Sequence, residues 1–231
     1  MSIKDKEAKL LTTWKLERGY PIFTFDGVFD EETYLKQTTK VLFVLKEADW
    51  PDANEDVHLV DYLLSEISPT YWKTWNNIAR WTQALLEGGE YPEYVSKGDK
   101  TNWLKKIAFA NLKKVPGGST ANTEEISKYV QNDALYLRKQ IELYTPDIII
   151  CCGRGEGKNA DLLYNYVLKD CIAESWSNHP IVDKYNYFKV LLNGKLVPVV
   201  SFVHPQMRGN HEKFKKYYED MLQVKVLLEG R

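Results

Sequence analysis

Residues 146–153 read Pro-Asp-Ile-Ile-Ile-Cys-Cys-Gly, and this stretch indicates the fold class. Its five central residues are apolar and lie between chain-breaking residues, as in a strand that is buried on both faces of a parallel sheet. Val41-Leu-Phe-Val-Leu45, Ile107-Ala-Phe-Ala-Asn111 and residues 196–203 have the same apolar character. These runs predict the strands of one central sheet.

Segments with helical periodicity alternate with the predicted strands. They are residues 4–18, two helices within 58–87 that are separated at Ser68-Pro69, and residues 122–144, 159–167 and 211–228. Asn193-Gly194 predicts a tight hairpin between residues 187–192 and 196–203. The alternation predicts an α/β protein, a three-layer α/β/α sandwich around a mostly parallel four-stranded sheet. We expect a single domain over residues 1–231, with residues 1–40 as a helical extension packed on it.

The composition is that of an ordinary globular protein, with 44% hydrophobic and 27% charged residues. The three cysteines, Cys151, Cys152 and Cys171, form no spaced framework, which is typical of a chain in a reducing cytoplasm. No Cys-x-x-Cys pair occurs, so the sequence predicts no zinc site, iron–sulfur cluster or other cofactor. The apolar runs are far shorter than the roughly 20 residues that span a bilayer. We therefore expect a cytoplasmic monomer without membrane contact.

The formal net charge of −1 and pI of about 6.5 do not favour nucleic-acid binding, which depends on clustered Lys and Arg. Local basic groups do occur, among them Lys113-Lys114 and the segment from Arg208 to Lys216. Such groups can face phosphates, or they can be ordinary solvated surface lysines. Charge alone leaves both alternatives open.

Polar residues follow several of the predicted strands directly. Lys46-Glu47-Ala48-Asp49 follows the first, Asn111 ends another, and His204-Pro205 follows the last. Open α/β sheets bind their ligands outside the carboxyl ends of the strands. These segments therefore predict one polar site at that edge of the sheet.

With these segments in this order, the chain resembles the uracil-DNA glycosylase superfamily over residues 40–225. Members carry a carboxylate or amide just after the first strand, an Asn at the end of another strand and a His-Pro-Ser turn after the last. The strand at 146–153 is similar to their penultimate strand. Three positions depart from the usual pattern: Lys46 stands in place of a glycine, Asp49 in place of a proline, and Gln206 in place of the serine. The resemblance therefore implies glycosylase chemistry but leaves the excised base open.

The resemblance implies specific roles for the polar groups. Glu47 would stabilise the positive charge on the sugar and orient the attacking water, with Asp49 as the second choice for this carboxylate. Alternatively, Glu47 only caps a turn. His204 would donate a hydrogen bond to the departing base, since positioned donors of this kind stabilise developing negative charge. Asn111 would read the edge of a flipped-out base, or it only bonds its own loop.

The DNA contacts implied by the resemblance lie around this site. Tyr62 or Trp50 would stack on the base, although simple core packing is the alternative for either ring. Gln206, Met207 and Arg208 resemble the wedge loop that fills the gap left by the extruded base. Flipping costs a few kcal/mol, so a wedge and stacking contacts are needed to offset it. Lys113 and Lys114 are the expected phosphate contacts on a neighbouring loop.

The sequence thus predicts a monofunctional DNA glycosylase that acts on single- or double-stranded DNA and excises a modified pyrimidine, with a role in defence against phage DNA. No lysine is marked as a nucleophile, although Lys46 is a candidate worth testing. The alternatives are a housekeeping uracil-DNA glycosylase and a catalytically silent DNA- or protein-binding protein of the same fold. A flavodoxin-like domain that binds a phosphorylated molecule at residues 153–157 is a further alternative, but the glycine spacing matches no nucleotide motif.

Overall fold

The computed structural model describes residues 1–65, 67–118 and 120–228. Its central feature is a six-stranded sheet in the order β4-β2-β5-β8-β7-β6. Four of these strands run parallel, namely β4 (Ala108–Asn111), β2 (Val41–Leu45), β5 (Ile148–Cys152) and β8 (Lys195–Phe202). All the apolar runs expected to form strands are therefore neighbours in one sheet, and the predicted α/β class is confirmed.

The sheet is larger than the predicted four strands. β7 (Asn186–Leu192) pairs antiparallel with β8 through the turn at Asn193-Gly194, where both residues adopt positive φ. β6 (Ile172–Asn178) then pairs antiparallel with β7 and forms the edge of the sheet. The expectation missed β6 because an edge strand that is mostly exposed needs no apolar run; this one reads Ile-Ala-Glu-Ser-Trp-Ser-Asn. The sheet is thus mixed.

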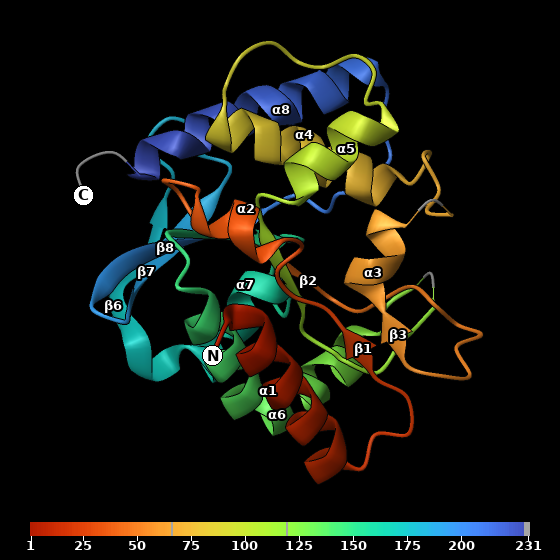
Figure 1. Cartoon of the computed structure of the whole chain (residues 1–231). Coiled ribbons are helices and arrows are strands. Elements are labelled where there is room, and N and C mark those ends of the chain that lie inside the picture. Colours follow the sequence, from red (N-terminus) through yellow and green to blue (C-terminus); the bar gives the residue numbers. More distant parts are fainter. Residues whose placement is uncertain (66, 119, 229–231) are drawn as a thin grey trace.

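Helices cover both faces of the sheet (Figure 1). One face carries α1 (Ile3–Arg18), α6 (Thr123–Tyr144) and α7 (Asn159–Leu162), which continues into a π-helical turn at Leu163–Val167. The other face carries α3 (Leu59–Leu64), α4 (Lys73–Leu86), α5 (Lys97–Leu104) and α8 (His211–Val224), which a 3-10 turn extends to Leu228. The remaining short elements are α2 (Glu31–Leu35), the 3-10 turn at Lys169–Cys171, and a small parallel pair of β1 (Thr24–Phe25) and β3 (Val57–His58).

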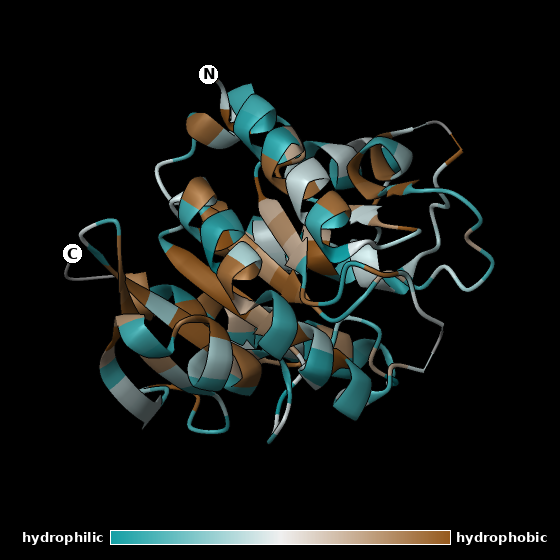
Figure 2. Ribbon diagram, turned by 90° about the horizontal axis from the view of Figure 1, so that it is seen from below, coloured by the Kyte–Doolittle hydropathy of each residue, from teal (hydrophilic) through white to brown (hydrophobic). Residues whose placement is uncertain are grey.

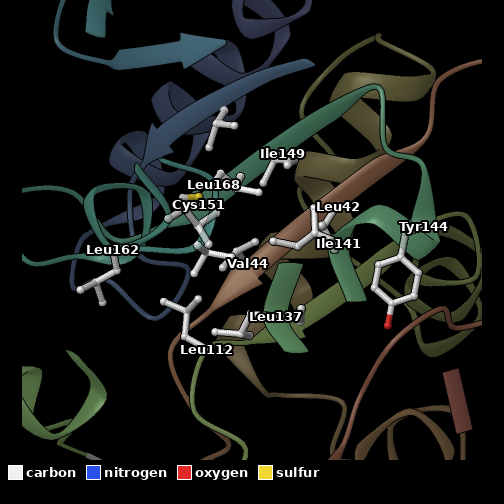
Figure 3. Close-up of a cluster of buried hydrophobic side chains, with 14 of the residues drawn as sticks. Leu42, Val44, Leu112, Leu137, Ile141, Tyr144, Ile149, Cys151, Leu162 and Leu168 are labelled. Atoms are coloured by element: carbon white, nitrogen blue, oxygen red, sulfur yellow. The ribbon is translucent and has the colours of Figure 1, made fainter. Parts of the chain in front are cut away.

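The strand sequences feed two hydrophobic cores, one on each face. Apolar strands lie between helices with polar outer faces in Figure 2. Alternation along β2 sends Leu42 and Val44 toward α6, where Leu137 and Ile141 meet them (Figure 3). Phe43 belongs to the opposite core with the α4 and α8 side chains. A strand that is apolar at every position is required because both of its faces are covered.

Residues 1–40 are more than a helical extension. Besides α1 and α2 they contain β1, and Val28 forms a β-bridge with Ala108 of the main sheet. Thr24 N donates a 2.7 Å hydrogen bond to the carbonyl of Lys114, and Asp26 is almost fully buried. This segment therefore supplies part of the core and is joined to the loop after β4.

Among the described residues, no helix is both long enough and apolar enough to cross a bilayer.

Candidate functional site

A cavity of about 400 Å³ opens at the carboxyl ends of the parallel strands. Glu47, Asn111 and His204, which follow or end three different strands, all line this cavity. Further residues line the cavity: Lys46, Asp49, Trp50, Trp72, Lys73, Thr74, Gln206 and Met207. The volume lies within the range of about 300–1,000 Å³ that is usual for small-molecule sites.

The position of the cavity follows from the topology. After β2 the chain turns toward the face covered by α3 and α4, whereas after β5 it turns to α7 on the opposite face. Such divergence opens a crevice between neighbouring strand ends. Asn159 at the start of α7 joins the ends of β2 and β5, because its buried Nδ2 donates to the carbonyls of Val44 (3.0 Å) and Cys152 (2.8 Å).

Glu47 is held in place by an ion pair. Its Oε2 accepts a 2.7 Å hydrogen bond from Nζ of Lys113, and the two side chains are only 6% and 5% exposed. Lys113 also pairs with the half-exposed Glu125 at 2.8 Å. Among the described residues no donor to Glu47 Oε1 is present, so one carboxylate oxygen is available to a ligand or a water molecule.

A glycine lies directly against the same carboxylate. A Cβ placed on Gly117 would come within 2.3 Å of both Cδ and Oε2 of Glu47, far inside van der Waals contact. The backbone of Gly117 pairs with the chain on either side of Asp49, through Gly117 N to Ala48 O and Trp50 N to Gly117 O, each 2.9 Å. The Pro116-Gly-Gly segment therefore lies against the Glu47 carboxylate, and a side chain at residue 117 would displace either that carboxylate or the loop.

Asn111 is oriented by a buried carboxylate. Asp26 Oδ2 accepts hydrogen bonds from the backbone N (2.7 Å) and Nδ2 (3.1 Å) of Asn111. Asp26 is also bonded to Lys114 and to Gln140, which are both fully buried. Since a carboxylate paired with a lysine only accepts hydrogen bonds, Nδ2 must face Asp26. The Asn111 Oδ1 acceptor, which has no partner among the described residues, is therefore on the other side of the amide.

His204 is held as a neutral hydrogen-bond donor. Its Nδ1 accepts from the backbone N of Gln206 at 3.1 Å, so the neutral ring carries its hydrogen on Nε2. Burial and, to a smaller extent, the nearby charge of Lys46 lower the pKa of His204 to about 4. The turn itself is anchored to α4, because buried Asn77 Nδ2 donates to the carbonyl of Pro205 at 2.7 Å. At neutral pH the ring is thus uncharged.

Three aromatic rings form one side of the site. Trp50 packs edge-on against Tyr62 with ring centroids 4.7 Å apart, and Trp72 lies 5.6 Å from Tyr62. Trp50 and Trp72 line the cavity, whereas Tyr62 contacts both rings and is not among the lining residues. Trp72 was not predicted from the sequence, because it follows a proline-containing loop in which no motif occurs.

The structure separates the expected DNA contacts into two groups. Gln206 and Met207 line the cavity, and Arg208 is exposed next to them. Lys113 and Lys114 were wrong as phosphate contacts: they are 4% and 0% exposed, and both are ion-paired to buried carboxylates. Both lysines lie beneath the site and help to build it.

The glycine-rich loop at residues 153–157 offers little to a phosphate group. The backbone N–H of Gly157 donates to Asp161 at 2.8 Å, and α7, which follows the loop, is a single helical turn. The acidic side chains of Glu156 and Asp161 lie in the hollow beside it. Within residues 1–65, 67–118 and 120–228, no group of three or more His, Cys, Asp or Glu side chains is arranged to hold a metal ion.

The protein thus belongs to the α/β class and has a pocket, lined by polar and aromatic side chains, at the carboxyl ends of its parallel strands. Neither a scan against protein-family models nor a search of curated proteins found a match for the chain.

Proposed function

We propose that the protein is a DNA glycosylase that hydrolyses the N-glycosidic bond of a flipped-out base. The observation that carries this proposal is the presence of Glu47, Asn111 and His204 in one cavity, although they follow strands far apart in the sequence. Their chemistry is that of a carboxylate, an amide and a neutral imidazole donor. Each group matches one requirement of base excision.

The first requirement is stabilisation of positive charge on the sugar. As the glycosidic bond breaks, the sugar gains oxocarbenium character, which a nearby carboxylate stabilises. Glu47 keeps Oε1 available for a water molecule while Lys113 holds Oε2. Positioned acid–base help of this kind contributes about 10²–10⁴-fold in rate. Asp49 is the weaker candidate, because its side chain is exposed at the rim.

The second requirement is stabilisation of the departing base, which leaves with negative charge on its ring and carbonyl oxygens. A neutral His204 with its hydrogen on Nε2 supplies a donor to such an oxygen. Removing one donor of this type costs about 10²–10³ in rate. Because the ring is neutral, His204 stabilises the departing base through a hydrogen bond and does not transfer a proton to it.

The third requirement is recognition of the base. The fixed Asn111 amide presents Oδ1 to a base N–H, and Trp50 and Trp72 offer faces for stacking. Stacking on aromatic side chains contributes about 1–3 kcal/mol per base. The cavity is larger than a single pyrimidine ring and has an aromatic rim, which favours a pyrimidine with a bulky modification. A role in defence against phage with modified cytosines is consistent with such a substrate.

The experiment uses two substrate sets. Oligonucleotides with one uracil, single- and double-stranded, test the housekeeping alternative, and DNA from phages with modified cytosines tests the proposed substrate. Alkali then cleaves any abasic site. We expect cleavage of the modified DNA by the wild type and far less by Glu47→Gln. Cleavage confined to uracil would reassign the protein to repair, and no abasic site in any substrate would overturn the enzyme proposal.

A second candidate function is a catalytically silent DNA-binding protein. It is favoured by one observation, the near-complete burial of the Glu47–Lys113 ion pair, which a purely structural carboxylate would also show. This alternative predicts DNA retention that is the same for the wild type, Glu47→Gln and His204→Ala, without base release.

A further inference from the structure

One nucleophile in the cavity has no part in hydrolytic base excision. Lys46 directly precedes Glu47, and both residues line the same cavity. The Lys46 side chain runs across the end of β5, with its Cε 3.8 Å from the place that a Cβ would take on Gly153. The Lys46 side chain therefore lies in contact with the first residue after β5, beside the crevice between β2 and β5.

No ion pair engages this amine in the part of the chain that the structure describes. Among the described residues, Nζ of Lys46 has no hydrogen-bonded or ion-paired partner, whereas Lys113 and Lys114 beside the same site are each paired with a buried carboxylate. The charged groups that act on this amine are the adjacent Glu47 and a second cation, Lys158, whose Nζ is bonded to Thr123. Lys46 is half-buried, and burial and the charge of Lys158 lower its pKa from the ordinary value by more than the charge of the adjacent Glu47 raises it. A larger fraction of its amine is therefore neutral than for a solvated lysine.

We propose that Lys46 attacks the sugar aldehyde of an abasic site, which gives this pocket an abasic-site lyase activity in addition to base removal. The proposal rests on the proposed function for the identity of the substrate, since the aldehyde is the product of base excision. The lyase activity goes beyond the proposed function, because hydrolytic base excision requires no amine.

The chemistry needs no oxidant, reductant or bound ion. The lone pair of Nζ adds to C1′ of the ring-opened aldehyde, and loss of water leaves a protonated imine. A C2′ proton is then released to water, its electron pair forms the C2′–C3′ double bond, and the C3′–O bond breaks as the phosphate departs. Water finally hydrolyses the imine and regenerates the amine. The products are an unsaturated aldehyde at one strand end and a 5′-phosphate at the other.

The experiment starts from DNA that already contains an abasic site, so it does not depend on base excision by this protein. The full chain is incubated with this DNA in the presence of sodium borohydride, which reduces an imine to a stable amine and so links protein to DNA. We expect a covalent complex whose cross-link maps to Lys46 by peptide mass spectrometry. Lys46→Arg should lower its yield about tenfold or more, because a guanidinium stays protonated and does not form the imine.

The matched control is Lys73→Arg, which changes an exposed amine at the rim of the same cavity and should still be trapped at Lys46. Thermal unfolding of each variant shows whether it is folded. Absence of a complex from folded wild-type protein, or a cross-link at another amine, overturns the proposal. The proposal is also overturned if the wild type gives no trapped complex while Lys46→Gln binds intact DNA more weakly, because Lys46 would then be a phosphate contact. None of these results contradicts base excision. Conversely, a negative result in the alkali assay would not affect the trapping experiment, because its DNA already contains the abasic site.

Discussion

Nζ of Lys113 donates a 2.7 Å hydrogen bond to Oε2 of Glu47, and these two nearly buried side chains come from segments that are 66 residues apart. The pair joins the segment after β2 to the segment after β4. It fixes one carboxylate oxygen at the floor of the cavity and leaves the other available. Much of what the site can do follows from this contact.

The first prediction concerns the stability that depends on this pair. Lys113→Met leaves the Glu47 carboxylate, whose side chain is only 6% exposed, without its charged partner, and breaking a buried ion pair in this way typically costs about 3–5 kcal/mol. The free energy of unfolding, measured with urea, should fall by that amount. An exposed lysine of α6 provides the control, since Lys128→Met should change stability by no more than about 0.5 kcal/mol. Equal effects of the two substitutions would show that the ion pair contributes nothing.

The second prediction concerns the close approach of Gly117. Gly117→Ala puts a methyl group within 2.3 Å of the Glu47 carboxyl group, so the loop or the carboxylate must move. Overpacking of this kind costs about 1–3 kcal/mol. Gly118→Ala is the matched control, because a Cβ there meets no atom within 4 Å. Thermal unfolding midpoints should separate the two variants; a Gly117→Ala midpoint no lower than that of Gly118→Ala would contradict the described loop.

The third prediction concerns the charge state of His204. Its pKa is about 4 in the folded protein, against the ordinary 6.5 expected for the unfolded chain. Between pH 6.5 and 4 the unfolded state therefore binds more protons at this residue, so stability falls as the pH is lowered through this window. NMR titration of the ring should give a midpoint near 4. His204→Gln should remove that part of the pH dependence of unfolding, and a titration near 6.5 in the wild type would contradict the partly buried, neutral ring.

The fourth prediction concerns the aromatic side of the cavity. Trp72→Ala removes a stacking surface, which should weaken binding of single-stranded DNA by about 1–3 kcal/mol, roughly 5- to 150-fold. The neighbouring Tyr71 is 79% exposed and does not line the cavity, so Tyr71→Ala is the matched control. Fluorescence anisotropy with a labelled oligonucleotide measures both. If the two substitutions weaken binding equally, the wall formed by Trp50 and Trp72 has no special part in recognition.

The strands could be predicted from sequence because each buried strand is apolar at almost every position. β2, β4 and β5 are buried at every residue, so their apolar runs stand out from the rest of the chain. β6 has mostly exposed residues and left no such pattern. The outer strand β6 was therefore missed. The shared position of the carboxyl ends of the parallel strands was predicted, and with it the proximity of Glu47, Asn111 and His204.

The partners of these residues could not be predicted, since they depend on contacts between distant segments. Lys113-Lys114 has the sequence of a surface basic group, and only the fold shows that Glu47 and Asp26 bury it. Asp26 lies 85 residues before Asn111, in a segment expected to be an extension, yet it orients the Asn111 amide. Composition and spacing carry no information about such pairs.

The central claim, that the cavity excises a base from DNA, is tested most directly by mass-spectrometric detection of free base. DNA from phages with modified cytosines and uracil-containing DNA are each incubated with wild-type protein, Glu47→Gln and Glu125→Gln. The last variant removes only the exposed partner of Lys113. We predict that the wild type and Glu125→Gln release a modified base, and that Glu47→Gln releases it about 10²–10⁴-fold more slowly. Release of no free base from any DNA by folded wild-type protein, or equal release by Glu47→Gln, would contradict the account.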